Sequence, residues 1–181
     1  SSTSISAALG LVESKKILDE PGHVIAVIGD GALTGGLAYE GLNNAGRFKK
    51  NFIIVLNDNK MSISKNVGAV ARYLSAARIR PSYMKAKNTL ERILNKTPFG
   101  LKVKHWMKCS KSAVKKVVYK NSVFEDMGFA YYGPVNGHDF EQLEKVLKIA
   151  KNLNKPVVVH VITNKGKGYK FAEKNPKIYH G

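Results

Sequence analysis

The 181 residues, 44% of them hydrophobic, are enough for one globular domain with a core and exclude a disordered chain. No run approaches the roughly 18 apolar residues that a membrane span requires, and the single cysteine, Cys109, excludes a disulfide framework and favours a reducing, cytoplasmic compartment. The net charge of +17 is concentrated in residues 72–120, which hold fourteen Lys and Arg but one acid, Glu91.

The first third of the chain alternates between helix and strand patterns. Apolar residues at helical spacing predict a helix over residues 5–17, and a short continuous apolar run predicts a strand at Val24–Ile28 that is buried on both faces. Residues 35–46 again follow helical spacing, and Phe52–Leu56 is a second predicted buried strand. This is a β-α-β unit, so the two strands should be parallel.

Residues 72–120 have no comparable pattern of buried strands. We interpret them as a basic, largely helical and mobile insertion, which is either a positive cover over the binding site that attracts anionic substrates or a solvated linker. Helices and strands then alternate again, at Val123–Met127, Phe129–Tyr132, Asp139–Leu153 and Val157–Ile162. Asp139 with Gln142 three residues later has the pattern of a capping box. The predicted fold is therefore α/β, with a mostly parallel sheet flanked by helices.

The chain begins with Ser1, without an initiator Met and inside what resembles a motif. We therefore expect residues 1–181 to be a single but partial domain of a longer polypeptide.

Polar side chains follow both strands of the first β-α-β unit. Asp30 lies in Gly-Asp-Gly directly after the first strand, and Asn59 ends Asn-Asp-Asn after the second. If the strands are neighbours, their ends lie about 5 Å apart, and ligands of open parallel sheets bind beyond such ends. A carboxylate and a carboxamide that converge there suit Mg²⁺ completed by phosphate oxygens and water. The flanking glycines would let backbone N–H groups approach a bulky anion.

The spacing of 29 residues between Asp30 and Asn59 matches the fingerprint of thiamin-diphosphate sites. The stretches that carry a closer resemblance are SSTSISAALG, VIAVIGDGALTGGLAYEGLNNAG, VLNDNKMSIS, FEDMGFAYYGPVNGHD and KGKGYKFAEKNPKIYHG. They closely resemble the 1-deoxy-D-xylulose-5-phosphate synthases and cover nearly the whole chain except residues 72–120. In that family these segments belong to the first of three domains, so the resemblance implies a thiamin-diphosphate-binding fold.

The resemblance implies roles for particular residues. Asp30 and Asn59 would be magnesium ligands, together with the backbone carbonyl of Met61. Gly31 and Ala32 would approach the diphosphate through their backbone. The other residues with an implied cofactor contact are Ser1, Lys165, Tyr169 and His180.

The activity that the resemblance implies is a transferase reaction. Pyruvate loses carbon dioxide and its two-carbon unit is joined to glyceraldehyde 3-phosphate, which gives 1-deoxy-D-xylulose 5-phosphate for isoprenoid and thiamine biosynthesis. The implied cofactors are thiamin diphosphate and Mg²⁺, and we expect a homodimer with neither nucleic acid nor membrane as a partner. The family's activating glutamate and its aldehyde-phosphate site belong to the second domain, and a further histidine lies upstream of Ser1. We therefore name no catalytic residue in this chain and expect it to be inactive alone.

Three other interpretations remain open from the sequence. A transketolase or a 2-oxoacid dehydrogenase component would share Asp30 and Asn59, although the final KGKGY…YHG fits the synthases better. A nucleic-acid-binding module would use the basic residues 72–120. A cofactor-binding remnant without activity is the third.

Two histidines have structural interpretations. Asn136 departs from the Asp that the family more often has before Gly-His-Asp, and we interpret this loop as an Asn-Gly turn in preference to a catalytic role for His138. His160 lies within a strand and is predicted to be a core histidine whose hydrogen bonds are satisfied.

Overall fold

The computed structural model describes residues 2–48, 52–59, 122–176 and 178–179. Their strands form one sheet in the order β1-β2-β4-β3, in which every neighbouring pair is parallel. The strands are β1 (Ile25–Gly29), β2 (Phe52–Asp58), β3 (Ala130–Asn136) and β4 (Pro156–Ile162). The predicted parallel pairing of the first two strands is confirmed, as is the α/β class.

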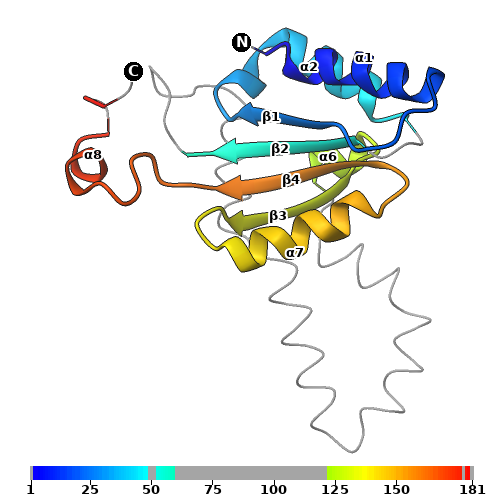
Figure 1. Ribbon diagram of the computed structural model, residues 1–181. Helices are drawn as coiled ribbons and strands as arrows, with labels where there is room; N and C mark the ends of the chain where they lie inside the picture. Colours follow the sequence, from blue (N-terminus) through cyan, green and yellow to red (C-terminus); the bar gives the residue numbers. More distant parts are fainter. Residues whose placement is uncertain (1, 49–51, 60–121, 177, 180–181) are drawn as a thin grey trace, which may run out of the picture.

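Helices connect and flank these strands (Figure 1). They are α1 (Ser4–Ile17), the short 3₁₀ helix η1 (Ala32–Thr34), α2 (Gly36–Ala45), α6 (Val123–Asp126), α7 (Phe140–Lys151) and α8 (Lys170–Lys174). The interpretation of residues 72–120 as a basic insertion lies outside the described residues. Within the described part of the chain, no helix is long and apolar enough to cross a membrane.

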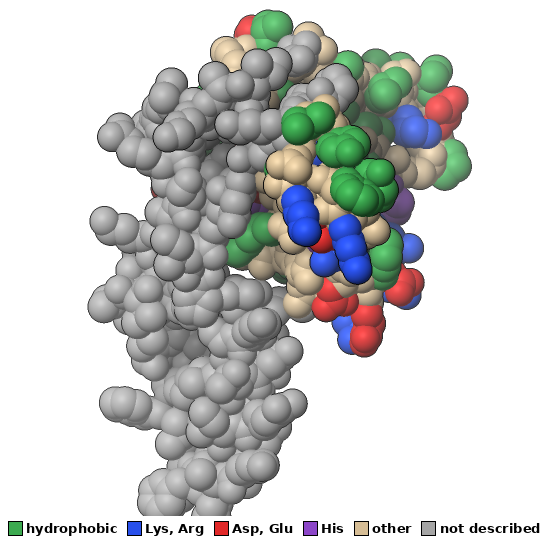
Figure 2. All heavy atoms as spheres, turned by 90° about the vertical axis from the view of Figure 1, so that its left-hand side faces the viewer, with side chains coloured by type: hydrophobic (Ala, Val, Ile, Leu, Met, Phe, Trp, Pro, Cys, Tyr) green, Lys and Arg blue, Asp and Glu red, His purple; other side chains and the backbone are tan. Residues whose placement is uncertain are grey.

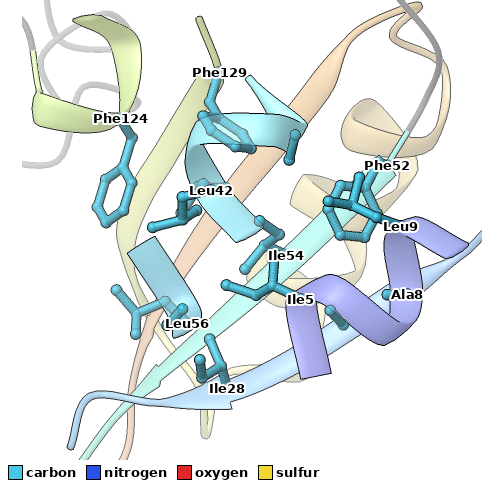
Figure 3. Close-up of a cluster of buried hydrophobic side chains, with 14 of the residues drawn as sticks. Ile5, Ala8, Leu9, Ile28, Leu42, Phe52, Ile54, Leu56, Phe124 and Phe129 are labelled. Atoms are coloured by element: carbon cyan, nitrogen blue, oxygen red, sulfur yellow. The ribbon is translucent and has the colours of Figure 1, made fainter. Parts of the chain in front are cut away.

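One face of the sheet is packed against α1 and α2. Alternate residues of a strand point to opposite faces, and the even-numbered apolar residues of β2 join the cluster on this face. The side chains drawn in Figure 3 include Ile5, Ala8 and Leu9 of α1, Leu42 of α2, Ile28 of β1, Phe52, Ile54 and Leu56 of β2, Phe124 of α6 and Phe129. This face is a closed apolar layer between the sheet and the two helices.

The opposite face carries α7, which packs against β2, β3 and β4. Val146 and Ala150 of α7 are buried against the odd-numbered residues of β4. On β1, however, Ile25 is 50% exposed and Val27 is 63% exposed. The prediction that the first strand is buried on both faces is therefore wrong, because the helix on this side lies over the other three strands.

The start of α7 differs in detail from the predicted capping box. The Asp139 side chain accepts a hydrogen bond from the Gln142 backbone N–H at 3.0 Å, as predicted. The Gln142 side chain instead accepts from the backbone N–H of Asn136. A complete capping box forms at α6, between Ser122 and Glu125. Both caps satisfy N–H groups that a helix leaves without partners.

Candidate functional site

The carboxyl ends of all four strands lie at one edge of the sheet, because the strands are parallel (Figure 1). Gly29 at the end of β1 pairs with Asn57 of β2, and the Asp30 backbone N–H donates to the Asn57 carbonyl at 3.1 Å. Asp30 and Asn59 thus follow adjacent strands, which is the condition for both side chains to reach one ligand. The Asp30 side chain is 3% exposed, and Asn59 is partly buried.

The glycines on either side of Asp30 do not have the positive φ angles that would require glycine. Gly31 has φ −65° and ψ −44°, which any residue can adopt. A Cβ added at Gly29 would meet no atom within 4 Å. The backbone at Gly29, one residue before Asp30, therefore has room beside it on the side where a Cβ would lie. The phosphate contacts implied for Gly31 and Ala32 remain predictions.

The beginning of α1 lies against the same turn. The Ser2 hydroxyl donates to the carbonyl of Ala32 at 2.8 Å, and a side chain at Gly35 would collide with Ser2. This contact brings the N-terminus of α1 to the residues that follow Asp30. Ser1, for which the resemblance implies a cofactor contact, lies outside the described residues, as do Met61 and His180.

A chain of hydrogen-bonded polar side chains runs across β2, β4 and β3, starting from the carboxyl end of β2. Asp58 and His160 are both 0% exposed, and His160 Nε2 lies 3.0 Å from Asp58 Oδ2. On the other side of the ring, His160 Nδ1 lies 2.7 Å from the hydroxyl of Tyr131. The prediction that His160 is a satisfied core histidine is confirmed. Sequence reasoning missed Asp58, although an acid between two asparagines at a strand end was a visible signal.

The loops after β3 and β4 are joined to each other. Asn136 Oδ1 accepts from the backbone N–H of His138, and Gly137 donates its N–H to the Ile162 carbonyl at 2.8 Å. The ring of His138 accepts at Nε2 from the backbone N–H of Asn164, at 2.8 Å. These bonds support the turn interpretation, and they give His138 the role of linking two loops.

The glycine-rich loop after β4 folds back on α8. Gly166 has φ +73°, and a Cβ there would press on Ala172 of α8. Glu173 accepts from the Gly168 N–H at 2.8 Å and lies 3.9 Å from the Lys167 ammonium. Lys167 of the loop therefore has an acidic partner in α8. This packing fixes the path of the chain between the end of β4 and α8.

Lys165 and Tyr169 both belong to this loop. Lys165 is partly buried in the turn, whereas Tyr169 is half exposed and its ring centroid lies 5.5 Å from that of Phe171. Figure 2 looks onto the carboxyl edge and shows hydrophobic side chains beside those of Lys and Arg. Since β4 is the neighbour of β2, the loop begins close to the end of the strand that precedes Asn59.

The residues at this edge fit a magnesium–diphosphate group. The structure places one carboxylate, Asp30, and one carboxamide, Asn59, after adjacent strands. Within the described ranges, no group of three or more His, Cys, Asp and Glu side chains could hold a metal ion. Asp30 and Asn59 could supply two oxygen ligands, and Mg²⁺ is usually bound through one or two carboxylates together with phosphate oxygens and water.

The parallel sheet with helices packed on both faces defines the fold class as α/β. The chain is similar to transketolase from Campylobacter jejuni, with a TM-score of 0.53, 20% sequence identity and coverage of 93% of this chain and 21% of that one. At that identity the likeness shows the fold alone.

A family model described as 1-deoxy-D-xylulose-5-phosphate synthase matches residues 1–163, and the chain belongs to that family. The 1-deoxy-D-xylulose-5-phosphate synthase of Clostridium kluyveri is 51% identical over 182 aligned residues, and that of Desulfitobacterium hafniense is 48% identical. Both matches cover 100% of this chain and 29% of the relative. The chain thus spans less than a third of these relatives, and the family favours the synthase over the transketolase and nucleic-acid interpretations.

Proposed function

We propose that this chain binds the diphosphate of thiamin diphosphate through Mg²⁺ held by Asp30 and Asn59. The observation that carries the proposal is the placement of these two oxygen ligands after adjacent parallel strands, whose ends are joined by the Asp30–Asn57 backbone hydrogen bond. Ligands of such sheets bind beyond the carboxyl ends of the strands. The backbone carbonyl of Met61 would be a third ligand.

The other cofactor contacts are proposed from the family resemblance, and the positions of neighbouring described residues support some of them. Gly31 and Ala32 would approach the diphosphate through the backbone of the turn that starts η1. Ser1 adjoins Ser2, which bonds to Ala32. Further cofactor contacts are proposed for the residues that the family resemblance implies near the C-terminus, namely Lys165, Tyr169 and His180.

The complete protein is proposed to convert pyruvate and glyceraldehyde 3-phosphate into 1-deoxy-D-xylulose 5-phosphate. Thiamin diphosphate, when bound, supplies the electron sink for decarboxylation, and the protein supplies binding, orientation and electrostatics. The contribution of this chain is the anchor at the diphosphate end. The acid–base groups and the phosphate site for the aldehyde are proposed to lie in the remainder of the polypeptide, and we propose a cytoplasmic homodimer.

The test replaces the carboxylate that the anchor requires. Asp30→Asn removes the charge but keeps the shape of the side chain. In the complete protein, calorimetric titration should show a magnesium-dependent affinity for thiamin diphosphate that is lower by at least about tenfold, or about 1.4 kcal/mol. A matched control is Asp126→Asn at the end of α6, which should leave the affinity unchanged. Unchanged affinity in Asp30→Asn would refute the assignment.

A second measurement addresses the missing parts of the site. The purified 181-residue chain, supplied with both substrates, Mg²⁺ and thiamin diphosphate, should form no 1-deoxy-D-xylulose 5-phosphate above background. The reason is that the activating glutamate and the aldehyde-phosphate site are proposed to be elsewhere. Steady product formation would mean that catalytic groups lie within these residues.

A further inference from the structure

The hydrogen-bonded chain of Asp58, His160 and Tyr131 is polar, yet it lies on the closed apolar face of the sheet. The carboxylate of Asp58 and the ring of His160 are fully buried. Removing a carboxylate from water is costly unless a hydrogen-bonding partner compensates for the loss of solvation. With the imidazole in the tautomer protonated at Nε2, the ring donates to Asp58 Oδ2 and accepts the Tyr131 hydroxyl at Nδ1. Each group then has a partner of the required kind.

The Tyr131 end of this series of hydrogen bonds is held in place by packing against α6. The ring of Tyr131 stacks on Phe124 of α6, with centroids 5.7 Å apart and planes inclined by 7°. Phe124 is buried and follows the capped N-terminus of α6. The position of the Tyr131 hydroxyl is therefore fixed from a helix on one side, and the hydroxyl in turn fixes the plane of the His160 ring.

The other end of this series of hydrogen bonds is Asp58, the last residue of β2. Asp58 is the residue between Asn57 and the proposed metal ligand Asn59. The backbone there is also tied to the residue that follows β4, since Thr163 donates its N–H to the Asp58 carbonyl at 3.0 Å and its hydroxyl to Asn57 Oδ1 at 2.7 Å. The last residue of β2 is thus held through its side chain by β4 and through its main chain by Thr163, one residue before Asn59.

The same contacts distinguish two carboxylates that lie at one edge. Asp30 and Asp58 are both buried and follow paired positions, Gly29 and Asn57, of neighbouring strands. His160 takes Asp58 as its hydrogen-bonding partner. The Asp58 carboxylate is therefore engaged by His160, whereas Asp30, which follows β1, is the carboxylate that we propose as the metal ligand.

We infer that His160, oriented by Tyr131, positions Asp58 and through it the metal ligand Asn59. The inference rests on the proposed magnesium site and assigns to His160 and Tyr131 the part of positioning residues, which do not touch the cofactor. Groups behind a metal ligand commonly change metal affinity by about 10- to 100-fold when they are removed. Here the effect would pass through the backbone at the end of β2.

The experiment uses two substitutions, each of which keeps a polar group at the position of one of the two imidazole nitrogens. The amide nitrogen of His160→Gln can take the place of Nε2 and donate to Asp58, whereas the shorter amide of His160→Asn reaches only the position of Nδ1. In the complete protein with saturating thiamin diphosphate, Mn²⁺ binding is followed by the electron paramagnetic resonance of the free ion. His160→Asn should weaken Mn²⁺ binding by about tenfold or more. His160→Gln should restore most of the affinity, and Tyr131→Phe should cause a smaller loss than His160→Asn.

Two further readouts separate positioning from general destabilisation. The Mg²⁺ concentration for half-maximal activity should rise in His160→Asn, with kcat recovered at saturating Mg²⁺. Thermal unfolding of the metal-free Gln and Asn variants should show that both are fully folded at the temperature of the binding measurement, so a loss of folded protein does not account for their different affinities. If His160→Asn does not fold, Tyr131→Phe decides the matter, because it keeps the stacked ring and removes only the hydroxyl.

The outcomes distinguish this inference from the function on which it rests. If Asp30→Asn weakens Mn²⁺ binding but His160→Asn and Tyr131→Phe bind it as the wild type does, the positioning role is wrong and the metal site stands. If Asp30→Asn itself binds Mn²⁺ normally, the proposed metal site is wrong. Equal weakening in His160→Gln and His160→Asn would also overturn the inference, since the contact to Asp58 would then not matter.

Discussion

The two faces of the sheet differ in how completely they are covered. On the face packed by α1 and α2, Ile54 of β2 is 1% exposed and belongs to a continuous cluster (Figure 3). On the face packed by α7, Ile25 of β1 remains half exposed, and an apolar groove separates β1 from the helix. Strands with equally apolar sequences therefore have different surroundings, and the closed face is the one that holds the buried pair of Asp58 and His160.

This difference has a consequence for the site. Hydrogen bonds to a carboxylate are stronger where water is excluded, and the closed face provides that exclusion for Asp58. The half-open face provides no comparable shelter beside β1. The hydrogen bonds of Asp58, His160 and Tyr131 are therefore stronger on the face covered by α1 and α2 than they would be on the half-open face. Substitutions on the two faces can be compared by their effects on the free energy of unfolding.

The largest effect is expected from Ile54→Ala on the closed face. Truncation of a fully buried isoleucine removes its burial and leaves a cavity, and the cost should be about 2–5 kcal/mol in the free energy of unfolding. Urea denaturation of the chain measures it. A cost below that range would mean that α1 and α2 pack less tightly on the sheet than the closed cluster indicates.

A smaller loss is expected from Gly41→Ala, at the contact of the two helices on the same face. A Cβ at Gly41 would lie 2.9 Å from Cγ2 of the buried Ile5, so one helix must shift. Overpacking of this kind costs about 1–3 kcal/mol, and the helix preference of alanine offsets about 1 kcal/mol of it. We expect a net destabilisation in urea denaturation.

Gly10→Ala in α1 is the matched control for this substitution. A Cβ there meets nothing within 4 Å, and Gly10 is exposed in the middle of the helix. The same change should stabilise the chain by about 0.5–1 kcal/mol. If both alanines stabilised the chain, close packing of α1 on α2 would not be the reason for Gly41.

Ile25→Ala tests the half-open face with the same chemical change as Ile54→Ala. Since half of the Ile25 side chain is exposed, less area is lost from burial, and the cost in the 181-residue chain should be below about 1 kcal/mol. The ratio of the two costs measures the difference between the faces. A cost equal to that of Ile54→Ala would show that the face beside β1 is covered in solution.

The smallest effect is expected on the outer surface of α7. Lys148 and Glu144 form an ion pair of 2.6 Å with both side chains about two-thirds exposed. The hydrogen bond and charge of Lys148 lower the pKa of Glu144, so any stabilisation is present above the ordinary carboxyl pKa and is lost as the pH falls through the lowered value. Lys148→Ala should leave the unfolding temperature unchanged within error, because exposed pairs contribute little.

An NMR titration of Glu144 provides the positive readout for that variant. Its pKa should move back up toward the ordinary carboxyl value when Lys148 is removed. An unchanged pKa would show that the pair does not persist in solution. A clear fall in the unfolding temperature would show instead that the outer surface of α7 contributes to stability as the closed face does.

The sequence was sufficient for features that depend on neighbours along the chain. Short apolar runs and helical spacing predicted the strands and the longer helices, with shifts of a few residues at their ends. The two predicted strands of one β-α-β unit placed Asp30 and Asn59 directly after neighbouring strands. The Asp139 cap was also predicted, because a side chain that caps a helix acts within three residues of its own position.

Other features depend on which segments meet in space, and only the tertiary structure decided them. The strand order β1-β2-β4-β3 places His160 beside Asp58, 102 residues away, and gives Tyr131 its contact with the same ring. It also leaves β1 at the edge of the described sheet, where α7 does not reach. Hydrophobic periodicity records that a residue faces inward but not what it faces. For that physical reason the sequence determined the strands and the candidate metal ligands, while the fold decided which buried groups hold them in place.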